Sequence, residues 1–188
     1  RGSDFTGADL TGSSFKTSDV RDTVFDKADL TDCVFQTVDL TNASFNRAIL
    51  VRTTFSLSTL NGARFTGVRW LDARLSTMEL KGAIFDGCSF HGVDFKECDL
   101  EGLNFDGQTF IGVKFDKTSL KDATFRKATI KNVSFVAPIV WSKKFYRAIK
   151  TICFDGATMD KLTYAALKGM EADLNKKLKS KNLKVNVY

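Results

Sequence analysis

The sequence is poor in the residues that most often build metal and catalytic centres. Of its 188 residues, one is histidine, one is proline and four are cysteine. His91 stands alone, so there is no histidine cluster to bind a metal ion, and we interpret it as a surface residue. No apolar run approaches the ~20 residues of a membrane-spanning helix, which excludes a transmembrane segment. We therefore expect no cofactor, no metal ion and no small-molecule substrate.

The chain also has no start that resembles a signal peptide. It opens at Arg1 without methionine, already inside the repeat described next. We interpret it as a cut or processed form from which an upstream targeting segment or another domain could be missing.

What the sequence does have is a period of five. From Phe5 to Val140 every fifth residue, here called the central residue, is large and apolar. Five fits neither the 3.6 of a helix nor the 2 of a strand, which indicates a repeat architecture. The residue two places earlier is usually small, and both should point inward from an extended backbone. Of the 13 glycines, 12 stand two places after a central position, or where the next such position would fall outside the run, and Gly169 is the exception; this fixed offset predicts a corner with positive φ.

A longer period of 20 residues lies on top of the five. Taking every fourth central residue gives one column that is entirely phenylalanine and another that is entirely aliphatic: Phe5, Phe25, Phe45, Phe65, Phe85, Phe105 and Phe125, and Val20, Leu40, Leu60, Leu80, Leu100, Leu120 and Val140. Four sides per turn follow, with residues 20 apart stacked at about 4.8 Å. The sequence therefore predicts an all-β solenoid, a quadrilateral β-helix of about seven to eight coils with a filled interior and a C-terminal α-helical cap.

Several units match a known motif. The segments Ala8-Asp9-Leu10, Ala28-Asp29-Leu30, Val38-Asp39-Leu40 and Cys98-Asp99-Leu100 resemble the pentapeptide-repeat family, whose unit is a small residue, Asp or Asn, Leu or Phe, and two polar residues. The match covers residues 1 to about 140. The resemblance implies a right-handed quadrilateral β-helix. Family members range from topoisomerase inhibitors to proteins with no known role, and some inhibit DNA gyrase, it is thought as acidic dimers that imitate duplex DNA.

Charge is divided unevenly along the chain. Residues 1–140 contain 17 basic and 18 acidic residues, whereas residues 141–188 contain 11 and 4. A neutral rod with a basic end is poorly suited to imitating DNA. The basic tail, Lys176, Lys177, Lys179 and Lys181, could instead bind nucleic acid or an anionic surface, which would show as strong salt dependence.

The cysteines look like core residues. Cys33, Cys88 and Cys98 occupy the small inward position on different sides of the square, and Cys153 lies beyond the regular run. We interpret the inward thiols as small hydrophobic side chains rather than as disulfides or metal ligands. A soluble protein in a reducing compartment follows as an expectation.

The many aspartates do not indicate an enzyme. They recur directly before the central residue, at Asp9, Asp19, Asp29, Asp39, Asp94 and Asp99. One fixed repeat offset favours backbone hydrogen bonding near corners over acid–base catalysis. A filled rod also has no natural concave pocket, so we expect no catalytic residue.

Arginines gather in one band of the rod. Residues 47–74 contain five arginines against Asp72 alone, and Val51 and Leu71 stack on an outward position 20 residues apart. Outward apolar residues rimmed by arginine resemble an interface core, although such a band is also compatible with a plain solvated wall. The predicted protein-contact residues are Arg47, Val51, Arg52, Arg69, Leu71 and Arg74.

The repeat stops after Val140. We divide the chain into a rod at 1–140, a helical excursion at 141–152, a last partial coil at 153–159, and a capping helix with tail at 160–188. Asp160 is a plausible N-cap of that helix. Its predicted buried stripe is Leu162, Ala166, Met170, Leu174 and Leu178. Val185 and Val187 alternate with polar residues, which suggests one short strand.

These features favour a non-enzymatic rigid scaffold for protein–protein interaction or assembly, with a protein partner or self-association. A DNA gyrase or topoisomerase-directed inhibitor, and an anionic-surface or nucleic-acid binder acting through the basic tail, are the alternatives.

Overall fold

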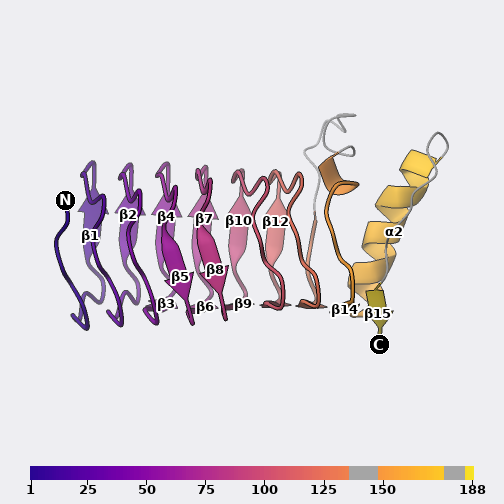
Figure 1. Cartoon of the computed structure of the whole chain (residues 1–188), viewed down its shortest axis with the longest axis horizontal. Helices are drawn as coiled ribbons and strands as arrows, with labels where there is room; N and C mark the ends of the chain where they lie inside the picture. The colour runs from indigo at the N-terminus through magenta and orange to yellow at the C-terminus, as the bar shows by residue number, and fades with distance from the viewer. Residues whose placement is uncertain (136–147, 176–184) are drawn as a thin grey trace.

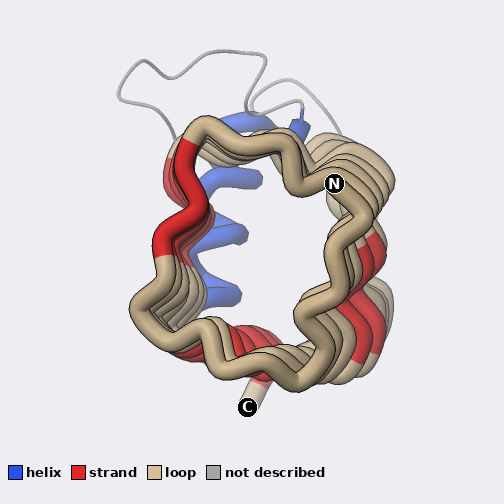
Figure 2. The backbone as a smooth tube through the Cα atoms, turned by 90° about the vertical axis from the view of Figure 1, so that its left-hand side faces the viewer, coloured by secondary structure: helices blue, strands red, loops and turns tan. Residues whose placement is uncertain are grey.

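A computed structural model describes residues 1–135, 148–175 and 185–188. In it the chain winds into a four-sided parallel β-solenoid, as the sequence predicts (Figure 1). Seen from the N-terminal end, the chain runs clockwise as it recedes, so the coil is right-handed (Figure 2). About six turns are complete before a partial turn near the C-terminal end, against the seven to eight coils expected.

The four walls are named here by their central residues. Face 1 begins with Phe5, face 2 with Leu10, face 3 with Phe15 and face 4 with Val20. The chain returns to the same face every 20 residues, and each return adds one central residue to the column of that face. Face 2 is the lower wall in Figure 2. Neighbouring turns pair through parallel bridges between residues 20 apart, such as Val51 with Leu71.

Faces 2 and 3 carry most of the regular strands, each three residues long. The face 3 sheet contains β1 (Ser14–Lys16), β2 (Val34–Gln36), β4 (Thr54–Ser56), β7 (Arg74–Ser76), β10 (Asp94–Lys96) and β12 (Lys114–Asp116). The face 2 sheet contains β3 (Ile49–Val51), β6 (Arg69–Leu71), β9 (Ser89–His91), β11 (Thr109–Ile111), β13 (Thr129–Lys131), β14 (Ala157–Met159) and β15 (Val185–Val187). Face 1 has β5 (Arg64–Thr66) and β8 (Ile84–Asp86), and the bridges of face 4, such as Asp19 with Asp39, are isolated.

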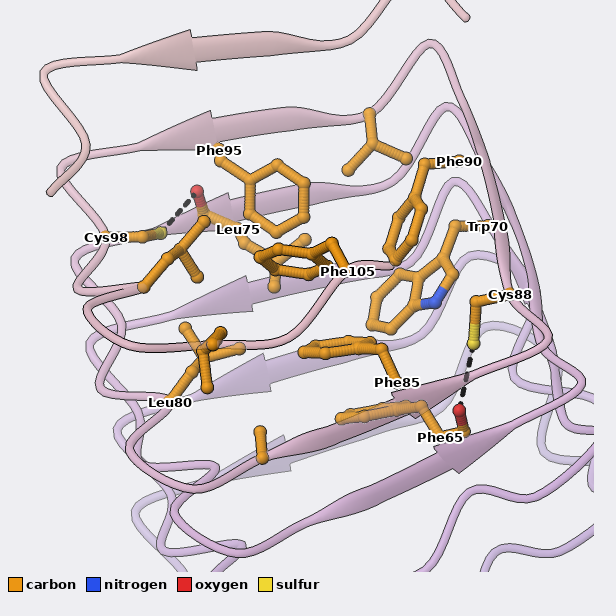
Figure 3. Close-up of a cluster of buried hydrophobic side chains, with 14 of the residues drawn as sticks. Phe65, Trp70, Leu75, Leu80, Phe85, Cys88, Phe90, Phe95, Cys98 and Phe105 are labelled. Atoms are coloured by element: carbon orange, nitrogen blue, oxygen red, sulfur yellow. Dashed lines mark hydrogen bonds between the residues drawn. The ribbon is translucent and has the colours of Figure 1, made fainter. Parts of the chain in front are cut away.

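Stacked aromatic rings fill the interior. In the face 1 column, the rings of Phe25 and Phe45 lie 5.0 Å apart and almost parallel. Phe25 meets Phe35 of the face 3 column edge-on at 5.7 Å. Offset stacks and edge contacts are the arrangements that aromatic quadrupoles favour. Trp70 is fully buried in the face 2 column and stacks on Phe90 (Figure 3). The predicted columns are thereby confirmed.

The corners have the predicted positive φ. Among the described residues, twelve glycines and sixteen others adopt it, all at the repeat position two places after a central one, a spacing into which Gly2 also falls. The glycines were indicated by the sequence, whereas Leu57 and Arg52, both with φ 51°, were not. The stacking of turns holds these residues in the left-handed region because the corner must form whatever residue occupies it.

After its excursion the chain rejoins the rod. Cys153 bridges Thr124, and Met159 of β14 pairs with Ile130, so the spacing of 20 becomes 29 here. β15 then pairs with β14, which confirms the predicted C-terminal strand. Of the excursion, residues 148–149 are helical, while most of the helix expected at 141–152 falls outside the described residues.

Helix α2 (Lys161–Asn175) crosses the C-terminal end of the rod (Figure 2). Among its described side chains, Thr163 and Leu167 are buried, whereas Leu162 is 73% exposed and Ala166 is also exposed. The predicted stripe through Leu162 and Ala166 is therefore wrong by about one position. The Thr163 hydroxyl accepts a hydrogen bond from the Val133 amide at 3.1 Å, and this contact sets the rotation of the helix. The remaining stripe residues and the lysine tail lie outside the described side chains. Among the described helices none is long and apolar enough to cross a bilayer.

Candidate functional site

Face 2 carries an exposed apolar cluster on two neighbouring strands. Val51 of β3 pairs in register with Leu71 of β6, and both point outward. Ile49, at the other end of β3, is 46% exposed and Leu71 is 40% exposed. Three aliphatic side chains on one flat wall form a contiguous surface of the kind that marks an interaction site.

Arginines surround this cluster. Arg47 stands at the corner before β3, Arg52 at the corner after it, and Arg69 is paired with Ile49 across the strands. We call the set Ile49, Val51, Leu71, Arg47, Arg52 and Arg69 the face-2 patch. Five of its members were predicted from the sequence. Arg74, the sixth predicted contact, instead lies on β7 of face 3, where it pairs in register with Asp94.

Ile49 is the residue that the sequence argument missed. It occupies the position directly before the central residue, where the same column has Asp9 and Asp29 in the preceding turns. Those two aspartates accept hydrogen bonds from the amides of Thr11 and Thr31 at 3.0 and 2.9 Å. Aliphatic Ile49 cannot make this bond. An apolar residue at an offset where aspartate has a structural role is the signal that could have identified it.

The arginines of the patch differ in their pairing. Arg52 donates Nε and Nη2 to the two carboxylate oxygens of Asp32, at 2.7 and 2.6 Å. This hydrogen bonding lowers the pKa of Asp32 and raises that of Arg52. Within the described residues, Arg47 and Arg69 form no ion pair. Two guanidinium groups therefore remain available beside the apolar cluster.

The recurring aspartates act on the backbone, as expected. Five of the six carboxylates accept a hydrogen bond from the amide two residues later, for instance from Arg21 to Asp19 at 3.1 Å and from Glu101 to Asp99 at 3.1 Å. Asp94 is different, because its Oδ1 has no partner among the described residues. In the described part of the chain, no group of three or more His, Cys, Asp or Glu side chains is arranged to hold a metal ion.

The expectation that the rod offers no concave surface is wrong. A hollow of about 1080 Å³ lies beside the late turns, where faces 3 and 4 meet and residues 148–151 return to the rod. Lysines on its wall are already paired, Lys117 with Glu97 and Lys121 with Glu101. Its lining includes the buried Cys98 thiol, which donates to the Leu75 carbonyl at 3.3 Å. Burial raises the pKa of that thiol to about 12, so it is not an activated nucleophile.

The inward cysteines are small core residues. The thiols of Cys33, Cys88 and Cys98 each donate to a carbonyl 23 residues earlier, and two of these bonds appear in Figure 3. Burial raises their pKa values to about 11, 11 and 12 respectively. All four cysteines are free, so no disulfide links the described turns.

Comparison with known proteins agrees with this architecture. A family model described as "Pentapeptide repeat region" matches residues 8–85, and a "Pentapeptide repeats (8 copies)" model matches residues 73–107 and 88–126. The chain belongs to the pentapeptide-repeat family. No curated protein sequence matches it.

Solved structures with similar coils include three pentapeptide-repeat proteins. QnrB1, a plasmid-mediated fluoroquinolone resistance protein, is 16% identical with a TM-score of 0.45, and the match covers 89% of this chain and 94% of QnrB1. HetL from the cyanobacterium Nostoc sp. strain PCC 7120, involved in heterocyst differentiation regulation, is 16% identical with a TM-score of 0.47 over 83% and 75% of the two chains. Rfr23 from the cyanobacterium Cyanothece 51142 is 22% identical with a TM-score of 0.41 over 70% and 90%.

Proposed function

We propose that this pentapeptide-repeat protein is a non-catalytic scaffold that binds another protein through the face-2 patch. The observation that supports this proposal is the apolar cluster of Ile49, Val51 and Leu71 on a rigid, flat sheet. Protein interfaces combine an apolar centre with a more polar rim and are enriched in arginine. Arg47 and Arg69, which form no ion pair with any residue that the structure describes, supply such a rim.

The backbone chemistry of the patch supports the same proposal. Where Asp9 and Asp29 cap amides, the next two turns have Ile49 and Arg69. Neither side chain can accept that hydrogen bond, so these turns forgo a contact that the preceding turns use. We infer that binding, rather than stability, accounts for the residues at this place.

The test compares two leucine-to-glutamate variants. Leu71→Glu places a carboxylate in the patch, while Leu57→Glu replaces another exposed leucine at a corner between faces 3 and 4. The wild-type chain and each variant are immobilised, and the partner proteins that each one retains are compared. The oligomeric state of the three chains is compared as well. We expect Leu71→Glu to lose partners that Leu57→Glu keeps, with both variants melting close to wild type. Identical retained proteins and oligomers for all three would overturn the proposal.

A second candidate function rests on charge. Residues 141–188 carry seven more basic than acidic residues. Binding of nucleic acid or an anionic surface through Lys176, Lys177, Lys179 and Lys181 would weaken steeply as salt rises. A salt-titrated DNA-binding assay with these lysines changed to glutamine tests that function, and a supercoiling assay tests gyrase inhibition.

A further inference from the structure

Four cations of the rod pair with a carboxylate that stands 20 residues earlier in the chain. These pairs are Arg52–Asp32, Lys117–Glu97, Lys121–Glu101 and Arg126–Asp106. Residues 20 apart occupy the same position in successive turns, so the two charges of each pair lie side by side along the rod axis. The rod thus has a regular way of neutralising its outward cations.

Three exposed arginines, Arg47, Arg64 and Arg69, have no such partner. The residues 20 places earlier are, in the same order, Lys27, Ser44 and Ile49. Among the residues that the structure describes, none forms an ion pair with any of these three arginines. Their charge is therefore left without an intramolecular counter-ion.

The three arginines surround one corner, Gly67, which lies between the right and lower walls in Figure 2. Arg64 belongs to β5 of face 1 and Arg69 to β6 of face 2. The chain between them spans at most about 17 Å when fully extended, and the bend at Gly67, with φ 66°, shortens that distance. Arg47 comes from the preceding turn, and its Cγ lies 3.6 Å from the place that a Cβ of Gly67 would occupy. Three guanidinium groups are thus within reach of one bound group.

We propose that this corner binds a phosphate group on the protein partner of the face-2 patch, a phosphorylated side chain held by Arg47, Arg64 and Arg69. This inference rests on the proposed function and names the chemistry of its partner. Arginine suits phosphate because its guanidinium group is always charged and donates two parallel hydrogen bonds. A phosphorylated side chain carries a charge of about −2 and three acceptor oxygens. Guanidinium groups from three sides match it better than they match a planar carboxylate with one charge.

The position of the corner beside the apolar cluster favours a protein as the carrier of the phosphate. Arg69 pairs in register with Ile49, and Arg47 stands at the corner directly before β3. A phosphorylated residue at Gly67 therefore places the neighbouring side chains of its own segment over the apolar cluster. One contact would supply charge recognition and the other would supply apolar burial.

Carboxylates on both sides limit the corner to a single phosphate along the rod axis. Asp29 pairs with Ile49 one turn before the site, and Asp86 pairs with Thr66 in the turn after it. A nucleic-acid strand carries a phosphate at every nucleotide. Along the rod axis, the phosphate next to the bound one would approach one of these carboxylates. The arrangement therefore favours an isolated phosphate over a nucleic-acid backbone.

Binding of degenerate peptide libraries to the whole chain of 188 residues tests the site. Three fluorescein-labelled nonapeptide libraries differ only in their central residue, which is phosphoserine, glutamate or serine. Fluorescence anisotropy at low salt measures the affinity of the chain for each library. We expect the phosphoserine library to bind at least about tenfold more tightly than the serine library, with the glutamate library between them.

Arg64→Gln is the most informative variant, because Arg64 lies on face 1, outside the face-2 patch. It should remove most of the preference for phosphoserine. Arg74→Gln is the matched control: Arg74 is also exposed and forms no ion pair with a described residue, but it lies on β7 of face 3. This control should keep the preference. Equal losses in the two variants would show that only net charge matters and would overturn the site.

A second pair of variants supplies the missing counter-ion. Gly67→Asp places a carboxylate beside the Arg47 side chain, whereas Gly67→Asn places a neutral side chain of similar shape there. Both residue types occupy corners of positive φ elsewhere in the rod, for instance Asp32 and Asn42. Gly67→Asp should abolish the preference for phosphoserine, and Gly67→Asn should keep more of it. Equal affinity of both variants for the phosphoserine library would contradict the role given to the free charge.

The outcomes separate this inference from the proposed function. Equal binding of the phosphoserine and serine libraries would overturn the inference. So would a duplex DNA probe that binds more tightly than the phosphoserine library and loses affinity in Arg64→Gln. The proposed function is tested separately, by the partners that the wild-type chain retains from a lysate and Leu71→Glu loses. If these partners are still retained after phosphatase treatment of the lysate, the proposed function stands and only this inference fails.

Discussion

Single corner residues store conformational strain in this fold. A residue other than glycine in the left-handed region costs about 1 kcal/mol, because its Cβ crowds the following carbonyl. Leu57 has φ 51° and a side chain that is 58% exposed, so little packing offsets the strain. The same strain recurs at other corners of the rod. Replacing one such residue with glycine should relieve it and change the free energy of unfolding measurably.

Leu57→Gly should therefore stabilise the chain. We expect the free energy of unfolding to rise by about 0.5–1 kcal/mol, since the relief of strain exceeds the added entropy of the unfolded chain. Gly82→Ala is the mirror control: its φ is 69° and no atom lies within 4 Å of the added methyl group, so only strain changes. The free energy of unfolding of Gly82→Ala should fall by about 1 kcal/mol. Urea unfolding measures both, and destabilisation by Leu57→Gly would contradict the argument.

The buried thiols give a second residue-scale prediction. Burial raises the pKa values of Cys33, Cys88 and Cys98 to about 11, 11 and 12, so at pH 8 almost none is thiolate, the form that reacts. In a colorimetric thiol assay the native chain should release at most one equivalent, from the half-buried Cys153, and four after unfolding. Cys153→Ser should release none before unfolding. More than one fast equivalent in the native wild-type chain would show that the turns open readily.

At the scale of the element, helix α2 ends the rod by replacing the next turn. The Asp160 carboxylate accepts hydrogen bonds from the amides of Asn132, Leu162 and Thr163 at 2.6, 3.0 and 3.0 Å. The Val133 amide donates to the Thr163 hydroxyl. If the rod continued, a further coil would accept hydrogen bonds from the amides of the last corner. Here the side chains at the start of α2 accept these hydrogen bonds instead. Capping here joins the helix to the sheet as well as satisfying the helix N-terminus.

Asp160→Ala should cost about 1–2 kcal/mol of unfolding free energy, and the loss should depend on pH. Burial alone would raise the pKa of Asp160, but the hydrogen bonds from Thr163, Asn132 and Leu162 outweigh it and lower the pKa to about 2, from an ordinary 3.8. The carboxylate therefore stabilises the fold fully above pH 3.8, and this contribution disappears as the pH falls through about 2.

Urea unfolding of wild type and Asp160→Ala between pH 6 and pH 2 measures this difference. Subtracting the two curves removes the effect of the other aspartates, which both proteins share. The exposed Lys161→Ala is the control and should follow wild type at every pH. A difference that stays constant down to pH 2 would mean that the charge of Asp160 has no part in the cap.

The elements also show how far the sequence alone determines the site. The period of 20 predicted that Val51 stacks with Leu71, because residues 20 apart occupy the same position in successive turns. The same counting placed Arg74 beside them, but a corner intervenes and directs Arg74 to face 3. The rotation of α2 was missed for a different reason: a long-range hydrogen bond from Val133 to Thr163 decides it, and helical periodicity within 160–178 carries no trace of that contact.

At the scale of the whole molecule, the rod is a one-dimensional stack in which each turn contacts only its neighbours. Phe85 stacks on Phe65 at 5.0 Å and makes a tilted contact with Phe105 at 5.2 Å, and comparable contacts recur along the phenylalanine columns. The stability of such a stack is approximately a sum of turns and of the interfaces between them. The effect of an inserted segment on stability should therefore depend on whether each central residue stays in its own column.

Duplicating residues 84–103 should add one turn and stabilise the chain. The inserted Phe85 and Phe90 would continue their own columns, and the corner glycines would stay at corners, so both the urea midpoint and the dependence of unfolding on urea should rise. Duplicating only residues 99–103 rotates everything after them by one face. Phe105 would then stack on Phe90 of face 2, and Phe115 would enter the leucine column of face 4 on Leu100. This shorter insertion should lower the midpoint below that of wild type. Equal stabilisation by both insertions would show that five-residue periodicity alone holds the rod together, and that the identity of the four columns has no energetic weight.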